Sequence, residues 1–551
     1  MEKLYFNKYQ SSLEELNIES YPQEVQEQFF DFINNVPFIK HLISPTRLRA
    51  KDLPRDSENK IIIDLTKPHI LEDMDYFRQT AIHFQKYGCF TKLRPNPNPN
   101  SEYGKWIREE IRRCFNGYIR ESDGEWIPGD LYFFLNYCPI PLTKMKAGSK
   151  KGERVTDFPE TWEGIYLRFH YINQAINGGM YDPLGGKNGC EVSSRGKSKS
   201  LTMASMMAKR FTLGENIGVT KNVKCMATAY QKQYLTSDGI LNKFQSYIDF
   251  LAEHTEFPAK RLKASMQDMQ WKMGYVDLDT GTQKGSLNEV IGVSAKDDPA
   301  KIRGKRLHLI IVEEFGSFKN VLGTYNVMLP SVQEGDISFG TIYLIGTAGD
   351  SESDFAGAQE IIYNPKGYNM YPLPNVFDKE GQGRKFITFF FPGYLNRKGC
   401  YDENGNSDVT KAILEILDNR YRIKHNSTDI NSITKAIAEI PITPQEAILR
   451  TKGNCFPVTQ LNERLNQLDN EPNEYNNVYV GDLIIDSSGE VKYIPTTNTP
   501  IRDFPLKDNK AEGALEIYAM PETDANNKVF PNRYIIGHDP KVLMGRIVVI
   551  L

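Results

Sequence analysis

The sequence lacks the cysteine and histidine spacings that mark zinc sites. Its seven cysteines include no C-x-x-C pair, and its eight histidines include no H-x-x-x-H pair. The missing C-x-x-C argues against a thiolate zinc site. An odd number of scattered cysteines also argues against a disulfide framework and fits reduced thiols in a cytosol.

Long hydrophobic runs and a large net charge are missing as well. No apolar run approaches the roughly 18 residues of a membrane-spanning helix, and the longest, LHLIIV and FITFFF, have the length of buried strands. The amino-terminal stretch MEKLYFNKYQ has no basic region followed by an apolar one, so no secretion signal is predicted. The formal net charge is −3, so any nucleic acid must be contacted through a local basic surface.

The 551 residues are enough for two or three domains, and the middle of the chain predicts an α/β fold. Apolar strands alternate with longer helical stretches between residues 189 and 350. The predicted elements are the strands NVKCMATA, NEVIGVS, LHLIIV and TIYLIGT and a helix over 231–251. Alternating strands and helices imply parallel pairing, so we expect a mostly parallel central sheet.

Changes of composition suggest three regions along the chain. The stretch Ser20–Ile43 predicts one amphipathic helix with Pro22 in its first turn. Beyond about Asn470 the pattern shifts to short strands and turns, as in GDLIIDSSGEVKYIP. The expected regions are an amino-terminal helical region over 1–120, a motor-like α/β domain over 121–470 and a second domain over 471–551.

The stretch CEVSSRGKSKS, residues 190–200, is similar to a phosphate-binding loop and is followed by a helical sequence. Such a loop binds phosphate because backbone N–H groups of a tight turn, at a helix amino terminus, point toward the phosphate oxygens. Lys199 would reach the β- and γ-phosphates of ATP, and the Ser200 hydroxyl would hold Mg²⁺. Ser193 and Ser198 stand where the pattern G-x-x-x-x-G-K-[ST] has glycine. The candidate nucleotide-binding residues are Ser193, Ser194, Arg195, Gly196, Lys197, Ser198, Lys199 and Ser200.

Taken alone, this loop is also compatible with a basic solvated turn. The strands that follow it provide the further evidence for a nucleotide site. LHLIIV ends in Glu313 and Glu314. A P-loop ATPase needs an acid after a buried strand to organise Mg²⁺ and a carboxylate to activate water. We assign Glu313 to the Mg²⁺ shell, through a water because glutamate is longer than the usual aspartate, and Glu314 to the attacking water. Thr347, after TIYLIG, is a candidate hydroxyl for the γ-phosphate.

Each of these two segments has a simpler interpretation. The segment that ends in Glu313 and Glu314 could be a buried strand followed by a solvated acidic turn, and the segment that ends at Thr347 could be an ordinary strand-to-loop turn. Their order along the chain favours the nucleotide site, because ligands bind at the carboxyl edge of strands in open α/β sheets.

With these motifs in this order, the chain resembles the large terminase subunit of tailed bacteriophages, the ATPase that drives DNA into proheads. The resemblance rests on Arg195 four residues before Lys199, on Arg303-Gly304 before LHLIIVEE, and on IGTAG in the next strand. The most specific match is IPITPQEAILRTKGNCF, residues 440–456, with its T-P-x-E-A segment. The resemblance implies an ASCE-type P-loop NTPase fold with a lid subdomain. It also implies that Arg195 senses γ-phosphate charge within its own chain and acts in catalysis with Lys199 and Glu314. An arginine finger from a neighbouring subunit is the alternative that stays open.

The resemblance extends to Asp539 in NRYIIGHDPKV. In that family a carboxy-terminal RNase H-like nuclease begins with a strand that ends in aspartate, which implies Asp539 as a ligand for Mg²⁺ or Mn²⁺. Two-metal hydrolysis needs several carboxylates, and no Asp or Glu follows Asp539. We therefore expect only the start of an RNase H-like α/β domain and a chain that does not cleave DNA alone. A capping or turn residue is the alternative for Asp539.

The resemblance implies a motor that uses ATP and Mg²⁺ to move double-stranded DNA into the prohead in the host cytoplasm. The implied partners are duplex DNA, the portal protein, the small terminase subunit and further copies of this chain in a ring, without a membrane. Two other functions stay open. One is another P-loop DNA translocase or helicase, and the other is a catalytically degenerate remnant that serves as a scaffold or DNA-binding protein.

Overall fold

The chain forms two compact units, Met1–Cys455 and Phe456–Leu551. The computed structural model describes residues 5–145, 152–295, 299–347, 355–429, 431–448, 479–489, 491–498, 514–517, 535–539 and 546–550. The second unit contains β19 (Tyr479–Ile485), which pairs antiparallel with β20 (Val491–Pro495) and β21 (Leu515–Ile517), and β22 (Ile535–Asp539), which pairs antiparallel with β23 (Arg546–Ile550). The strands predicted in GDLIIDSSGEVKYIP are present as β19 and β20. The domain boundary expected near residue 470 lies outside the described residues.

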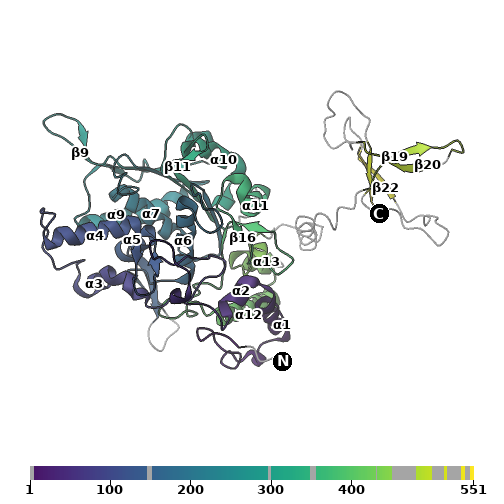
Figure 1. Cartoon of the computed structure of the whole chain (residues 1–551), viewed down its shortest axis with the longest axis horizontal. Coiled ribbons are helices and arrows are strands. Elements are labelled where there is room, and N and C mark those ends of the chain that lie inside the picture. The colour runs from purple at the N-terminus through teal and green to yellow at the C-terminus, as the bar shows by residue number, and fades with distance from the viewer. Residues whose placement is uncertain are drawn as a thin grey trace. The chain divides into compact units, whose positions relative to one another are not determined.

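An eight-stranded sheet forms the centre of the first unit (Figure 1). In spatial order its strands are β18 (Phe389–Phe391), β5 (Gly189–Ser193), β15 (Thr341–Gly346), β12 (Leu309–Glu313), β6 (Lys224–Ala229), β11 (Glu289–Ser294), β8 (Gln270–Met273) and β7 (Arg261–Ser265). The strands from β18 to β11 are parallel, and β8 and β7 extend the sheet antiparallel. The predicted mostly parallel α/β sheet is confirmed. Because β15 lies between β5 and β12, the strand order is that of an ASCE-type P-loop protein.

The central strands form because their apolar runs are covered on both faces. Every residue of β12 and β15 is buried, as expected for parallel strands between helical layers. Figure 1 shows α7 and α9 on one side of the sheet and α10 and α11 on the other. The helices are α1 (Gln23–Asn35), α2 (Pro37–Ile43), α3 (Gln79–Tyr87), α4 (Glu102–Asn116), α5 (Gly129–Tyr137), α6 (Glu163–Asn177), α7 (Lys199–Thr212), α8 (Gln233–Thr236), α9 (Ile240–His254), α10 (Val321–Met328), α11 (Phe355–Tyr363), α12 (Val409–Asn426), α13 (Asn431–Glu439) and α14 (Pro444–Ala447).

Short antiparallel hairpins complete the first unit. They are β1 (Tyr118–Ile119) with β2 (Trp126–Ile127), β3 (Ile140–Met145) with β4 (Gly152–Asp157), β9 (Tyr275–Val276) with β10 (Gln283–Lys284), β13 (Gln333–Glu334) with β14 (Ile337–Ser338), and β16 (Leu373–Pro374) with β17 (Phe386–Ile387).

Two predicted helices are each divided in the structure. The single helix expected over 20–43 is wrong, because α1 ends at Asn35 and α2 begins at Pro37. A proline has no N–H to continue the helix and disfavours helical backbone in the residue before it. Val36 accordingly has extended backbone, with φ of −98° and ψ of 112°. The helix expected over 231–251 consists of α8 and α9.

The amino-terminal segment is fastened to the beginning of α12. The Gln10 side chain donates a hydrogen bond to the Ser407 carbonyl at 2.9 Å, and the backbone N–H of Ser11 donates to Asp408 at 3.1 Å. Further along, Arg47 forms a fully buried ion pair with Glu163 of α6. Through these contacts, the described residues of the amino-terminal region pack as part of the first compact unit.

Candidate nucleotide-binding site

The loop between β5 and α7 contains two residues with left-handed backbone. Strand β5 ends at Ser193, and α7 begins at Lys199. Gly196 has a φ of 78° and Ser198 a φ of 53°. Left-handed backbone costs a residue with a Cβ roughly 1–2 kcal/mol and costs glycine almost nothing. Ser198 therefore holds, at an energetic cost, a conformation that glycine adopts freely, at the position where the P-loop pattern has glycine.

We predict that Ser198→Gly stabilises the protein by about 0.5–1 kcal/mol, because the relieved strain exceeds the extra entropy of an unfolded glycine. Urea unfolding measures the change. Ser194→Gly is the matched control, since Ser194 has no positive φ. The control should destabilise the protein, and a loss of stability in both variants would contradict the strain at Ser198.

Ser200 and Glu313 come together across the carboxyl edge of the sheet. The Ser200 hydroxyl, in the first turn of α7, donates a hydrogen bond to Glu313 Oε1 at the end of β12. Glu313 Oε2 is buried and has no hydrogen-bond partner among the residues that the structure describes. Burial, with the charge of Glu314 adding to it, raises the pKa of Glu313 to about 7, against the opposing effects of Ser200 and Lys199. An orphaned buried carboxylate oxygen beside a hydroxyl fits a Mg²⁺ ion that takes its other ligands from phosphates and water.

Glu314 lies between the lysine of the loop and the end of β15. Its Oε1 is 3.3 Å from Lys199 Nζ. Its Oε2 accepts hydrogen bonds from the Thr347 N–H at 3.1 Å and from the Thr347 hydroxyl at 3.4 Å. Glu314 also has left-handed backbone, with a φ of 48°. The structure thus gathers Lys199, Glu314 and Thr347 from three different strand ends.

The close approach of β15 to Glu314 requires glycine at position 346. A Cβ on Gly346 would lie 2.8 Å from Glu314 Cα and 3.0 Å from Glu314 Oε2. A contact this short is not tolerated without movement, so a side chain here would displace the carboxylate. The glycine at position 346 of IGTAG is therefore required for steric reasons. Ala348 and Gly349 of the same motif lie outside the described residues.

Arg195 does not join this group of side chains. Its guanidinium is largely exposed and forms a 2.9 Å ion pair with Glu439, the last residue of α13. Its backbone N–H donates to the Glu439 carbonyl at 2.9 Å, and the N–H of Ser194 donates to the Phe391 carbonyl at 2.9 Å. The first half of the loop is therefore bound to α13 and β18. The contact with Glu439 has no signal in the sequence, because it joins segments far apart in the chain.

The side chain of Lys197 points away from the loop, and its place among the nucleotide-binding residues stays a prediction. Its Nζ is buried and donates to the carbonyls of Gly393 at 3.0 Å and Leu395 at 2.5 Å. It also lies 5.7 Å from the centre of the Phe391 ring. Burial lowers the pKa of Lys197 from 10.5 to about 7. Only the backbone of Lys197 is left to contact a phosphate.

We predict that Lys197→Met removes a pH dependence of stability between pH 7 and 9. In this range the unfolded lysine binds a proton and the folded one loses it, so the wild-type stability rises with pH by up to about 1.4 kcal/mol per unit. Urea unfolding at several pH values measures the slope. Lys435→Met, which changes an exposed lysine, should keep the wild-type slope. An unchanged slope in Lys197→Met would show that the folded amine stays charged.

A buried ion pair beneath the loop was not predicted. Arg168 of α6 donates to both carboxylate oxygens of Glu191, at 2.7 and 2.6 Å, and both side chains are fully buried. The same guanidinium donates to the Lys197 carbonyl at 2.9 Å and to the Thr202 hydroxyl at 3.1 Å. Arg168 thereby connects strand β5, the loop and helix α7. The signal in the sequence was the charged Glu191 inside the strand GCEVS, because a buried carboxylate requires a partner.

The T-P-x-E-A segment is held by a second paired arginine. Pro444 starts α14, and Glu446 forms a bidentate ion pair with Arg420 of α12, at 2.8 and 2.7 Å. Glu446 also accepts a hydrogen bond from the Ile442 N–H at 2.6 Å. The glutamate of this segment therefore fixes the connection between α12 and α14. The glycine and phenylalanine that follow, Gly453 and Phe456, lie outside the described residues.

Asp539 ends β22 in the second unit, where its backbone is paired with Arg546. Its assigned role as a metal ligand stays a prediction. Within the described ranges, no group of three or more His, Cys, Asp or Glu side chains is placed to hold a metal ion. The same ranges also contain no helix that is long and apolar enough to cross a membrane.

No protein-family model and no curated protein matches the chain. Solved structures do match. The ATPase domain of the large terminase of Thermus phage P74-26 is 15% identical, with a TM-score of 0.31, over 46% of this chain and 88% of that one. The large terminase of bacteriophage HK97 is 12% identical, with a TM-score of 0.30, over 54% and 52% of the two chains. A large terminase of a thermophilic bacteriophage, solved in complex with ADP, is 11% identical, with a TM-score of 0.26, over 44% and 46%.

Proposed function

We propose that this chain is a DNA-packaging ATPase of the large terminase type, which hydrolyses ATP to move duplex DNA. The observation that carries the proposal is the convergence of Lys199, Glu314 and Thr347 beside the Ser200–Glu313 pair. All five residues lie at the carboxyl edge of β5, β12 and β15, where ligands bind in open α/β sheets. The order of the sequence motifs and the T-P-x-E-A segment support the terminase type within the P-loop ATPases.

In this proposal ATP lies against the loop 193–200, with its phosphates at the amino terminus of α7. Ser200 and Glu313 would hold Mg²⁺, which supplies charge neutralisation at the phosphates when it is bound. Lys199 would exchange its 3.3 Å contact with Glu314 for the terminal phosphates.

Glu314 then remains as the base that orients and deprotonates the attacking water. The two hydrogen bonds from Thr347 hold its second oxygen, so the carboxylate keeps its position when Lys199 leaves. Arg195 would exchange Glu439 for the γ-phosphate, and this step would release the contact between the loop and α13.

Duplex DNA, the portal protein, the small terminase subunit and a ring of identical chains are the partners we propose, together with a site of action in the host cytoplasm. They rest on the resemblance to large terminases.

The proposal is tested by ATP hydrolysis with and without linear duplex DNA. We expect turnover that duplex DNA stimulates and that Lys199→Ala abolishes. A wild-type protein without turnover would instead support a catalytically degenerate remnant. A strand-separation assay on forked DNA distinguishes the helicase alternative, since a packaging motor moves duplex DNA without unwinding it.

A further inference from the structure

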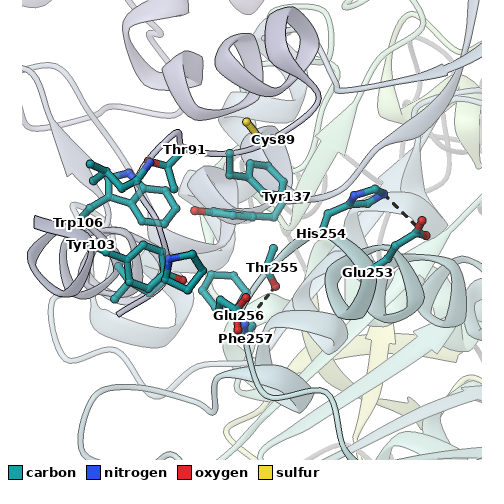
Figure 2. Close-up of a pocket in the computed structure, with 14 residues that line it drawn as sticks. Cys89, Thr91, Tyr103, Trp106, Tyr137, Glu253, His254, Thr255, Glu256 and Phe257 are labelled. Atoms are coloured by element: carbon teal, nitrogen blue, oxygen red, sulfur yellow. Dashed lines mark hydrogen bonds and ion pairs between the residues drawn. The ribbon is translucent and has the colours of Figure 1, made fainter. Parts of the chain in front are cut away.

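A small cavity lies between α4, the segment that precedes it and the end of α9, outside the nucleotide site (Figure 2). Its volume is about 190 Å³. Aromatic rings make up much of its wall, namely Phe90, Tyr103, Trp106, Tyr137 and Phe257. Figure 2 shows Tyr103 and Trp106 on one side, His254 and Glu253 on the other, and Tyr137 between them. The cavity is therefore an aromatic pocket whose lining includes two glutamates.

The rings are held in place by the surrounding structure. The Tyr137 hydroxyl donates to the buried Glu110 carboxylate at 2.6 Å, which directs that end of the side chain into the core. The Tyr137 ring lies 5.0 Å from Phe90 and 5.2 Å from Phe257, centre to centre, and Tyr103 lies 5.7 Å from Trp106. An aromatic wall fixed by such contacts is preorganised for a ligand.

The charged residues that line the pocket favour a cation. Glu253 and Glu256 line it, and no lysine or arginine belongs to its described lining. Glu256 lines the pocket together with Tyr103, and its charge adds to burial in raising the pKa of Tyr103. The carboxyl end of α9, at His254, adds the negative end of a helix dipole. His254 Nε2 lies 3.8 Å from Glu253, so Glu256 is the carboxylate left without such a neighbour in the lining.

The size of the pocket favours one side chain over a whole small molecule. Pockets for drug-sized ligands usually measure roughly 300–1,000 Å³. A planar guanidinium stacks on aromatic faces and pairs with carboxylates, whereas phosphate-bearing ligands are repelled by the two glutamates. We propose that this pocket binds an arginine side chain presented by a basic segment of a partner protein. This inference does not depend on the proposed ATPase activity.

The test is a titration of the full chain with the peptide acetyl-Gly-Arg-Gly-amide, followed by calorimetry and by tryptophan fluorescence, in which Trp106→Leu identifies the contribution of Trp106 among the four tryptophans. The peptide in which citrulline replaces arginine is the matched neutral probe. We expect saturable binding of the arginine peptide that is about tenfold tighter than that of the citrulline peptide. Glu256→Gln should remove most of this preference, and Trp106→Leu should weaken both peptides. Glu380→Gln, at an exposed glutamate elsewhere, should change neither.

Equal binding of both peptides, or no saturable binding by calorimetry, would overturn the proposal. Thermal unfolding of each variant shows whether a lost signal comes from misfolding, and Glu256→Gln, at an exposed position, should unfold like the wild type. Sedimentation velocity of the chain alone tests whether the pocket binds a second copy of the same chain. Self-association that Glu256→Gln abolishes would assign the pocket to a second copy of this chain and overturn the choice of a different partner.

Discussion

Glu314→Gln is expected to stop ATP turnover while nucleotide binding is kept. A glutamine cannot accept the proton of the attacking water, and positioned general bases contribute roughly 10²–10⁴-fold to rate. Binding should persist or become tighter, because Lys199 loses its 3.3 Å ion-pair partner and is free for the phosphates. Thr347 can still donate to the glutamine oxygen, so the local structure should stay intact. Phosphate release and fluorescent-nucleotide binding measure the two effects separately.

Two comparisons make this result specific. Lys199→Ala should lose binding as well as turnover, since it removes the group that reaches the β- and γ-phosphates. Glu380→Gln changes a side chain that is 75% exposed and should leave both quantities unchanged. Turnover in Glu314→Gln close to that of the wild type would exclude Glu314 as the base.

Arg168→Ala is expected to destabilise the first unit by about 3–5 kcal/mol, because it leaves Glu191 as an unpaired buried charge. It also removes the donor to the Lys197 carbonyl and so loosens the loop. The double variant Arg168→Ala/Glu191→Ala should recover part of the loss, since the orphaned charge is then removed too. Urea unfolding of the single and double variants measures both terms.

The matched control is Arg422→Ala, which breaks an ion pair with Asp418 on the surface of α12. The Arg422 side chain is 64% exposed, so its loss should cost less than about 1 kcal/mol. If the Arg168 and Arg422 variants lost similar stability, the buried pair would have no special role beneath the loop.

Many residues of the candidate site could be predicted because they belong to short, local sequence motifs. Lys199 and Ser200 follow a loop before a helical pattern, and Glu313 and Glu314 end an apolar run, so each position could be recognised locally. Side-chain direction could not be recognised in this way. Lys197 belongs to the same basic stretch as Lys199, yet one lysine enters the core and the other faces Glu314.

The sequence by itself determined the alternation of strands and helices, the parallel sheet and the order of the motifs, because run length and periodicity report burial directly. Only the tertiary structure decided that β15 lies between β5 and β12 and thereby brings Thr347 to Glu314. It also decided that Arg168 and Glu191 form a pair below the loop. The physical reason is the same in both cases: these contacts join residues far apart in the chain, and their partners are selected by packing and by the cost of leaving a buried charge unpaired.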